Sequence, residues 1–207
     1  SILKLNILID GLYYYLDKEN HQAWVVPMPD GKYTGNIEIP DYIRYEGEVY
    51  SVTRIYEGAF SGCSGLTSID IPGSVTSIGE GAFYNCSGLA SVTIPNSVTS
   101  IGYGAFSDCY GLTSVTIGSS VTSIGSSAFS GCSGLSNVKV PVTDYSAFCN
   151  NAVVGLIASK IGKPVELIDK DGNEIKEYVI PEDVTSIGEN AFYNCRGLTS
   201  VTIGSSV

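Results

Sequence analysis

The sequence predicts a β-rich repeat solenoid, a right-handed superhelical coil in which each turn of the chain adds one parallel strand. Three observations support this fold class. A unit of 23 residues recurs in register, short segments alternate apolar with polar residues, and Pro or Gly ends most of these segments. The composition agrees, because the 207-residue chain has 24 Gly, 14 Tyr and 43% hydrophobic residues, which is too apolar for a disordered chain.

Five segments of the sequence align without gaps and define the repeat. They are Ile55–Ile71, Ile78–Ile94, Ile101–Ile117, Ile124–Val140 and Ile187–Ile203. Three structural columns stay in step through all five copies: Phe60, Phe83, Phe106, Phe129 and Phe192; Cys63, Cys86, Cys109, Cys132 and Cys195; and Leu66, Leu89, Leu112, Leu135 and Leu198. One coil cannot bury its own apolar face, so neighbouring coils must stack, with parallel strands about 4.8 Å apart.

Each unit is expected to contain three parts. Ser91–Ile94 alternates and predicts a strand with Val92 and Ile94 pointing inward. Ser97–Ile101 is a second extended stretch on the return side of the coil. Gly102–Cys109 is too short for a full helix and suits a single helical turn.

The ends of the strands indicate the number of coils. Seven strands end in Ile or Val followed by Pro or Gly, at Ile39, Ile71, Ile94, Ile117, Val140, Ile180 and Ile203. The intervals from Ile39 to Ile71 and from Val140 to Ile180 are longer than the repeat period, whereas the other intervals equal it, which indicates insertions in two coils. Residues 37–207 are therefore predicted to form one solenoid domain of about seven coils, with insertions near residues 42–50 and 143–176.

The two insertions have signals of their own. Tyr42–Tyr50 predicts a small hairpin around Gly47. Asn151–Ile161 has the apolar spacing of a helix with one buried face, so one longer helix is expected in the second expanded coil. Pro164–Tyr178 predicts a strand, a turn at Asp171-Gly172 and another strand, which would form a protruding hairpin.

Residues 1–36 do not repeat and are predicted to form a β-rich N-terminal cap. Leu3–Leu16 and Ala23–Val26 look like strands, and a solenoid needs its first apolar face covered. The other end has no such cover, because the sequence stops at Val207 part-way through a coil. We therefore expect either further chain or an uncapped sheet edge that another molecule seals, including end-to-end self-association through this edge.

Charge and hydropathy argue against two classes of interaction. The net charge of −10 repels a phosphate backbone, so nucleic acid is not an expected partner. No run of 18 apolar residues occurs, so no membrane span is expected. No charged segment followed by an apolar core opens the chain, so we expect no signal peptide within it.

No catalytic, metal or cofactor site is assigned from the sequence. The Cys spacing of 23 residues does not match the closely spaced pairs of metal sites. Neighbouring coils could bring two Cys within disulfide range, but a column of buried free thiols is the favoured interpretation. His21 is the only His and lies in a predicted turn. Asp169–Glu174 resembles part of a calcium loop, and a hairpin turn is the favoured alternative.

The unit VTSIGxxAFxxCxGLxSVTIP resembles the BspA-like leucine-rich repeats of bacterial surface proteins and is similar to the treponemal type. The resemblance covers about residues 37–207, and Asp10–Leu16 (DGLYYYL) looks like the start of the N-terminal region of such proteins. It implies a curved solenoid exported to the bacterial cell surface, in a family implicated in adhesion to host matrix proteins and other cells. The coil around Cys149 departs from the pattern, because no Gly-Leu follows.

The leading hypothesis is a non-enzymatic extracellular or cell-surface protein that binds a protein or host-matrix partner, as an adhesin does. The candidate recognition face consists of the outward strand positions Ser68, Asp70, Ser91, Thr93, Ser114, Thr116, Asn137, Lys139, Ser200 and Thr202. It lacks the aromatic and Arg anchors of good interfaces, which favours the Tyr-rich segment Ser1–Tyr56 and the second insertion as the binding regions. The alternatives are a rigid spacer that displays another domain and a carbohydrate-binding module or enzyme, with a cleft lined by Tyr13, Tyr14 or Trp24.

Overall fold

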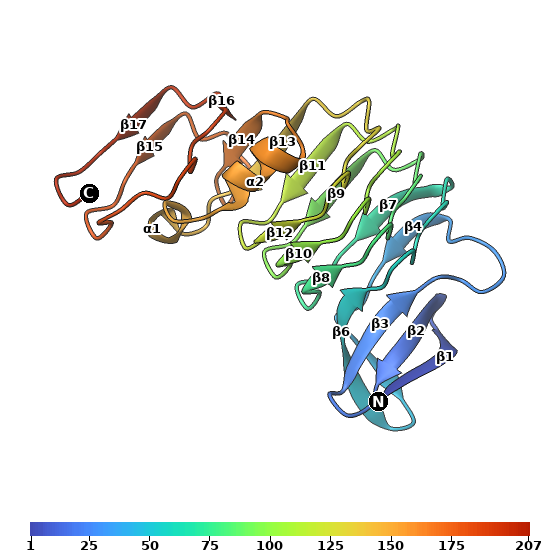
Figure 1. Cartoon of the computed structure of the whole chain (residues 1–207). Helices are drawn as coiled ribbons and strands as arrows, with labels where there is room; N and C mark the ends of the chain where they lie inside the picture. Colours follow the sequence, from blue (N-terminus) through green and yellow to red (C-terminus); the bar gives the residue numbers. More distant parts are fainter.

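The computed structural model describes residues 1–207 and shows coils stacked in a curved row, with an N-terminal β-meander at one end (Figure 1). The meander consists of β1 (Ile2–Ile9), β2 (Leu12–Asp17) and β3 (Gln22–Val26). The stretch Leu3–Leu16, predicted as extended, is divided by a tight turn at Asp10 and Gly11, whose φ angles are 49° and 85°. An Asp-Gly pair adopts these positive angles readily, which produces the antiparallel pairing of β1 with β2.

The meander continues directly into the solenoid through one sheet, which we call the return sheet. Its strand order is β1-β2-β3-β6-β8-β10-β12, with β5 also paired to β6. The new strands are β5 (Tyr42–Tyr45), β6 (Glu48–Ile55), β8 (Ser77–Ile78), β10 (Ser100–Ile101) and β12 (Ser123–Ile124). The antiparallel pairing of β5 with β6 around Gly47 confirms the predicted hairpin.

The strand predicted in each repeat unit is confirmed, and we call these the front strands. They are β4 (Gly35–Glu38), β7 (Leu66–Asp70), β9 (Ser91–Ile94), β11 (Ser114–Ile117) and β13 (Asn137–Pro141). The register advances by one repeat from strand to strand, so that Ser91 lies beside Ser114 and Ser114 beside Asn137. On the return side the strand within the predicted stretch is limited to Ser100–Ile101, because Val98 N donates to Pro95 O in a turn, although Thr99 N still donates to Thr76 O of the preceding coil.

The stretch that follows each return strand is a run of tight turns. Within one coil Ala105 N donates to Gly102 O at 3.3 Å, and between coils Phe83 N donates to Ala105 O at 2.7 Å. Two positions of each copy have positive φ, such as Gly81 at 57° and Asn85 at 57°. Gly, Asn and Asp adopt this conformation at the least steric cost, which explains why these residues predominate in the two columns.

The apolar columns form one core cluster of 53 buried residues, which runs through the meander and the coils. The rings of Phe60, Phe83, Phe106 and Phe129 stack nearly parallel, with centroids 5.1, 4.8 and 5.0 Å apart. Tyr33, just before β4, contacts the first ring at a centroid distance of 4.9 Å and closes this Phe ladder. Each aromatic side chain buries about 150–250 Å², so the ladder is a major contribution to stability.

The second insertion contains two helices, α1 (Tyr145–Phe148) and α2 (Val153–Lys160). The helix predicted over Asn151–Ile161 is confirmed by α2, which buries Val153, Val154 and Ile157. It packs against β12, the last strand of the return sheet. The insertion therefore lies against the sheet edge at which the regular coils end.

Over Pro164–Tyr178 the predicted strand, turn and strand are confirmed, but their pairing into a protruding hairpin is wrong. Its first half, β14 (Val165–Ile168), pairs in parallel with β13 and with β16 (Cys195–Arg196), whereas β15 (Glu177–Val179) pairs in parallel with β17 (Ser200–Thr202). One isolated antiparallel bridge, between Ile168 and Glu174, is all that resembles a hairpin. Val165 and Leu167 are each 1% exposed, and a hairpin in solvent would leave such apolar side chains uncovered.

Packing becomes looser in the last coil. Phe192, Cys195 and Leu198 are only partly buried, although the same columns are buried in the four preceding aligned copies. Ile203 is 62% exposed, and no strand forms at Ser186–Ile187. The apolar surface of this coil is therefore open to contact.

Candidate functional sites: a cleft and an aromatic platform

The candidate recognition face lies in rows on the outside of the front strands and of β17. Its members with exposed side chains are Ser68, Asp70, Ser91, Thr93, Ser200 and Thr202, and those half-buried are Ser114, Thr116, Asn137 and Lys139. The row begins with an in-register pair of acids, because Glu38 on β4 lies beside Asp70 on β7. Short hydroxyl side chains make up its middle, so the face remains a prediction with no aromatic anchor.

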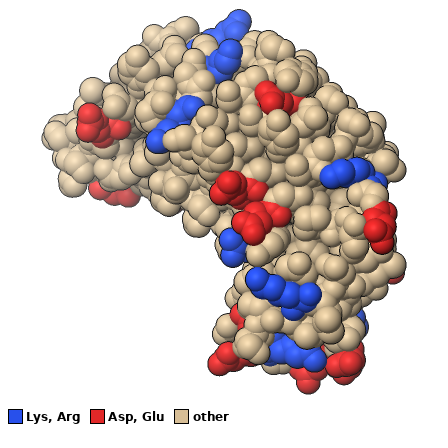
Figure 2. All heavy atoms as spheres, turned by 45° about the vertical axis from the view of Figure 1, so that its right-hand side comes forward, with Lys and Arg blue, Asp and Glu red and all other residues tan.

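Charged side chains are unevenly distributed over the surface. In Figure 2 they crowd the lower end of the molecule, while most of the surface above it is uncharged. The regular coils contribute little to this charge, because no Lys or Arg occurs between Arg54 and Lys139. Charged side chains are therefore concentrated outside the plain coils.

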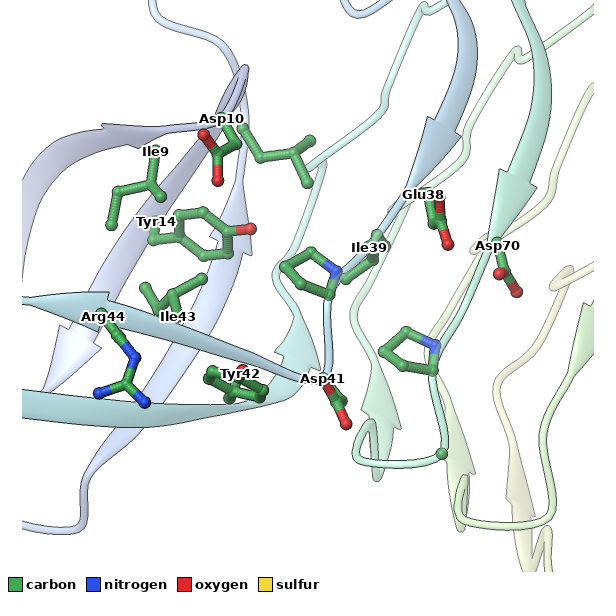
Figure 3. A pocket seen from close by; sticks show the side chains of 14 residues that line it. Ile9, Asp10, Tyr14, Glu38, Ile39, Asp41, Tyr42, Ile43, Arg44 and Asp70 are labelled. Atoms are coloured by element: carbon green, nitrogen blue, oxygen red, sulfur yellow. The ribbon is translucent and has the colours of Figure 1, made fainter.

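A cleft of about 810 Å³ opens where the meander meets the first coils (Figure 3). Its floor is apolar and comes from β2, β5 and the segment after β4: Leu12, Tyr14, Ile39 and Ile43, all buried. Its rim has four exposed carboxylates: Asp10, Glu38, Asp41 and Asp70. A volume of this size lies within the range of about 300–1,000 Å³ for small-ligand pockets.

Local structure explains why the four acids converge. Asp10 occupies the β1–β2 turn, which needs a residue that tolerates positive φ. Glu38 and Asp70 lie side by side at the ends of two parallel strands, and parallel strands end at the same sheet edge. Asp41 follows Pro40, which lies just beyond the first front strand and has no N–H with which to continue its pairing. Turn chemistry and strand register therefore bring the acids to one rim.

No cation neutralises this rim. The four ion pairs of the chain all lie elsewhere. The one basic residue in the lining, Arg44, lies over the Tyr42 ring at 5.9 Å. Four acids and one arginine leave the lining with a formal charge of −3. The cleft therefore favours a cationic ligand.

Tyr14 adds an unpaired hydroxyl to the floor of the cleft. Its side chain is 1% exposed, and its hydroxyl makes no hydrogen bond within the chain. Figure 3 shows the hydroxyl end of the ring directed toward the Ile39 side of the cleft. Burial, with Tyr33 and Asp10 nearby, raises the pKa of Tyr14 well above its ordinary value, so the phenol stays protonated. It can donate one hydrogen bond to a ligand or accept one from it.

A second group, which we call the aromatic platform, consists of Tyr15, Trp24, Arg54 and Tyr56. The Arg54 guanidinium lies 5.1 Å from the Trp24 ring centroid and 5.5 Å from that of Tyr56. The two rings stack on each other at 5.8 Å, and Tyr15 meets Tyr56 edge-on at 5.4 Å. All four side chains are half-buried, and the buried Nε of Arg54 has no acceptor.

The platform has the composition that protein interfaces use as anchors, namely Trp, Tyr and Arg. It forms because β3 pairs with β6, which places Trp24 opposite Arg54. From the sequence, Trp24 was singled out only as a possible sugar contact, and Arg54 and Tyr56 were not singled out. Their only signal was the Tyr-rich composition of the segment Ser1–Tyr56.

The sequence-derived Cys column lies inside the coils. Cys63, Cys86, Cys109 and Cys132 are buried, and all six Cys are free thiols. The thiols of the last three of these donate to the carbonyl oxygens of Phe60, Phe83 and Phe106, each at 3.1 Å. No group of three potential metal ligands gathers anywhere in the chain. The thiols therefore hydrogen-bond each coil to the one before it.

We expect these thiols to be unreactive while the protein is folded. Burial raises the pKa of the Cys86 thiol to about 12, so the nucleophilic thiolate is scarce at pH 8. A thiol reagent followed by peptide mass spectrometry should leave Cys86 and Cys109 unlabelled at pH 8 and label both in urea. Cys195, in the looser last coil, is the internal control and should react first. Rapid labelling of Cys86 in the native protein would contradict the packing described.

Two other residues considered from the sequence, His21 and Asp169, make contacts within the chain. His21 stacks on Tyr50 at a centroid distance of 5.6 Å, and its Nδ1 lies 3.3 Å from a Glu48 carboxylate oxygen. The Asp169 carboxylate accepts hydrogen bonds from the backbone N–H of Asn173 and of Asp171, each at 2.9 Å. These bonds lower the pKa of Asp169, and its carboxylate is used to hold the turn.

Comparison with known proteins agrees with this architecture. The family model of the BspA type leucine rich repeat region matches in six copies, over residues 50–165 and 170–207. No curated protein matches the sequence. None of the helices is both long and apolar enough to cross a membrane.

Three solved structures show the likeness in detail. A leucine-rich repeat protein of T. pallidum has a TM-score of 0.52 and 20% identity, covering 96% of this chain and 82% of that one, which shows the fold alone. A leucine rich cell surface protein from Faecalibacterium prausnitzii has a TM-score of 0.54 and 26% identity, covering 95% of this chain and 54% of that one. A leucine-rich repeat protein from Bacteroides capillosus has a TM-score of 0.58 and 26% identity, covering 65% of this chain and 96% of that one.

Proposed function

Because the chain belongs to the BspA-type leucine-rich repeat family, we propose that it is a non-enzymatic protein of the bacterial cell surface that binds a protein or extracellular-matrix partner, as an adhesin does. The family and the similarity to a cell surface protein of F. prausnitzii support this location and role. The partner contacts the return sheet, and the aromatic platform is its anchor.

The observation that carries this proposal is the solvent-facing stack of Trp24, Arg54 and Tyr56. A rigid aromatic stack loses little side-chain entropy on binding, and its half-buried area is removed from water when a partner covers it. The Arg54 guanidinium, held over the two rings, can also donate a charge-assisted hydrogen bond to an acceptor of the partner. The hydroxyl rows of the front strands offer no comparable gain.

The proposal is tested with a panel of immobilised extracellular-matrix proteins. We expect at least one to bind the full chain, and Tyr56→Ala or Trp24→Ala to weaken that binding roughly tenfold or more, as truncation of an interface anchor does. The matched control is the pair Thr93→Ala and Thr116→Ala on the front strands, which should bind as the unchanged protein does. The proposal is contradicted if no matrix protein in the panel binds the chain, or if the front-strand variants weaken binding as much as Tyr56→Ala and Trp24→Ala do.

A second candidate, a rigid structural spacer, is favoured by the plain Ser and Thr rows of the front strands. It requires another domain in the same polypeptide, and sequencing of the full gene tests for one. A blank binding panel together with such a domain would favour the spacer. A sugar bound against Tyr14 or Trp24 would instead favour a carbohydrate-binding module.

A further inference from the structure

We infer that the cleft between the meander and the first coils is a binding site for a lysine side chain presented by a protein partner. This inference rests on the proposed function only in that the partner is a protein, because the cleft and the aromatic platform share no residue. Three features of the cleft point to this ligand: the charge of its rim, the chemistry of its floor and the unpaired hydroxyl of Tyr14.

The rim is suited to a cation that comes from outside the chain. Asp10, Glu38 and Asp70 have no ion-pair partner in the folded protein, and Arg44 is occupied over the Tyr42 ring. In Figure 3, Arg44 lies beside Tyr42, away from Glu38 and Asp70. The acids are also not clustered closely enough to hold a metal ion. They are therefore suited to a larger, organic cation.

The floor explains why that cation should be attached to an aliphatic stem. Leu12, Ile39 and Ile43 are each no more than 4% exposed and form the apolar side of the cleft. Lysine combines a four-carbon apolar stem with a terminal ammonium, so it can cover apolar surface while its charge reaches polar groups. A small inorganic cation would leave this floor without a partner.

The arrangement of acceptors favours lysine over arginine. An ammonium donates three hydrogen bonds in diverging directions, whereas the planar guanidinium is best matched by one carboxylate that accepts two parallel bonds. Here the acceptors come from separate segments, with Asp10 on the β1–β2 turn and Glu38 and Asp70 at the ends of two strands. The Tyr14 hydroxyl, which has no partner in the chain, supplies a further acceptor at the floor.

The test uses the full chain and small probes. Nα-acetyl-lysine N-methylamide is titrated into ¹⁵N-labelled protein, and its norleucine and arginine counterparts are titrated separately. We expect the lysine compound to shift the amide signals of Asp10, Gly11 and Asp41, with binding that weakens as salt is added. The norleucine compound, which has the stem without the charge, should shift them little. Equal shifts with norleucine, or tighter binding of arginine, would overturn the assignment.

Variants make the test specific. Asp10→Asn, Glu38→Gln and Asp70→Asn together should weaken lysine binding at least tenfold, and Tyr14→Phe alone should weaken it roughly tenfold, because it removes one hydrogen bond to the charged ammonium. The charge-matched control is Glu177→Gln, Glu182→Gln and Glu189→Gln in the C-terminal coils, which should bind normally. Undiminished binding by the cleft variant would refute the site.

The two proposals fail separately. If no matrix protein binds but the lysine compound shifts the amide signals, the proposal for the aromatic platform fails and the proposal for the cleft stands. If a matrix protein binds but the lysine compound causes no shifts, the cleft proposal fails and the platform proposal stands. Circular dichroism checks that each variant is folded, and because the substituted carboxylates are exposed and unpaired, we expect no loss of structure.

Discussion

Replacing Phe106 by Ala should lower the free energy of unfolding by about 3–5 kcal/mol. The ring is fully buried in the middle of the Phe ladder, with centroids of Phe83 and Phe129 at 4.8 and 5.0 Å. Removing it leaves a cavity between two coils whose backbones are joined by hydrogen bonds and cannot collapse freely. Urea denaturation followed by circular dichroism measures the change.

Two control variants test whether the loss of stability comes from the stacked Phe ladder and not from removal of any aromatic ring. Tyr103→Ala removes an aromatic ring from the same coil, but that ring is 58% exposed, so stability should change by no more than about 0.5 kcal/mol. Phe129→Ala should cost less than Phe106→Ala, because Phe129 stacks on a Phe ring on one side only. Equal effects of Phe106→Ala and Tyr103→Ala would show that the stacked ladder is not what holds the coils together.

Replacing Gly102 by Ala should destabilise the protein by about 1–3 kcal/mol, the usual cost of overpacking. A Cβ at this position would lie 2.6 Å from the backbone nitrogen of Glu80 and 2.7 Å from the carbonyl carbon of Gly79. Both atoms belong to the backbone of the preceding coil, so no side-chain rotation can make room. The same close approach recurs at Gly79 and Gly125, one repeat before and after.

The matched control for Gly102→Ala is Gly73→Ala. A Cβ at Gly73 would meet nothing within 4 Å, and Gly73 does not have positive φ. Alanine there should leave stability unchanged or raise it by about 0.5 kcal/mol, because it restricts the unfolded chain. Thermal unfolding of the two variants side by side measures the difference. If Gly102→Ala and Gly73→Ala unfolded at the same temperature, close packing between coils would not be the reason for glycine at positions 79, 102 and 125.

The repetitive part of the fold was predictable because every coil repeats the same local signals. Ser91–Ile94 and its counterparts alternate inward and outward residues, and the constant repeat spacing places them in register. The helix α2 and the hairpin around Gly47 also follow from local patterns. These features depend on residues close in sequence or one period apart.

The remaining features depend on contacts that have no period. The turn at Asp171-Gly172 follows from its sequence. The parallel pairing of β14 with the free edge of β13 does not, because no local pattern indicates which strand β14 will pair with. The aromatic platform requires Trp24 and Arg54, which are distant in the sequence, to meet through the pairing of β3 with β6. The cleft needs acids from a turn, two strand ends and a loop. Sequence composition pointed to this region, and the pairing of strands defines the sites within it.

The stacking of coils has a mechanical consequence. The backbone hydrogen bonds between coils run along the row, and the two ends of the chain lie at its opposite ends (Figure 1). A force applied to the two termini therefore acts along the direction of these hydrogen bonds. The bonds between one pair of coils can break before those between the next pair, whereas a shearing force would act on many bonds at once. Each released coil of 23 residues lengthens the chain by about 75 Å at full extension. Under tension applied along the row, the solenoid would yield coil by coil and act as an extensible element.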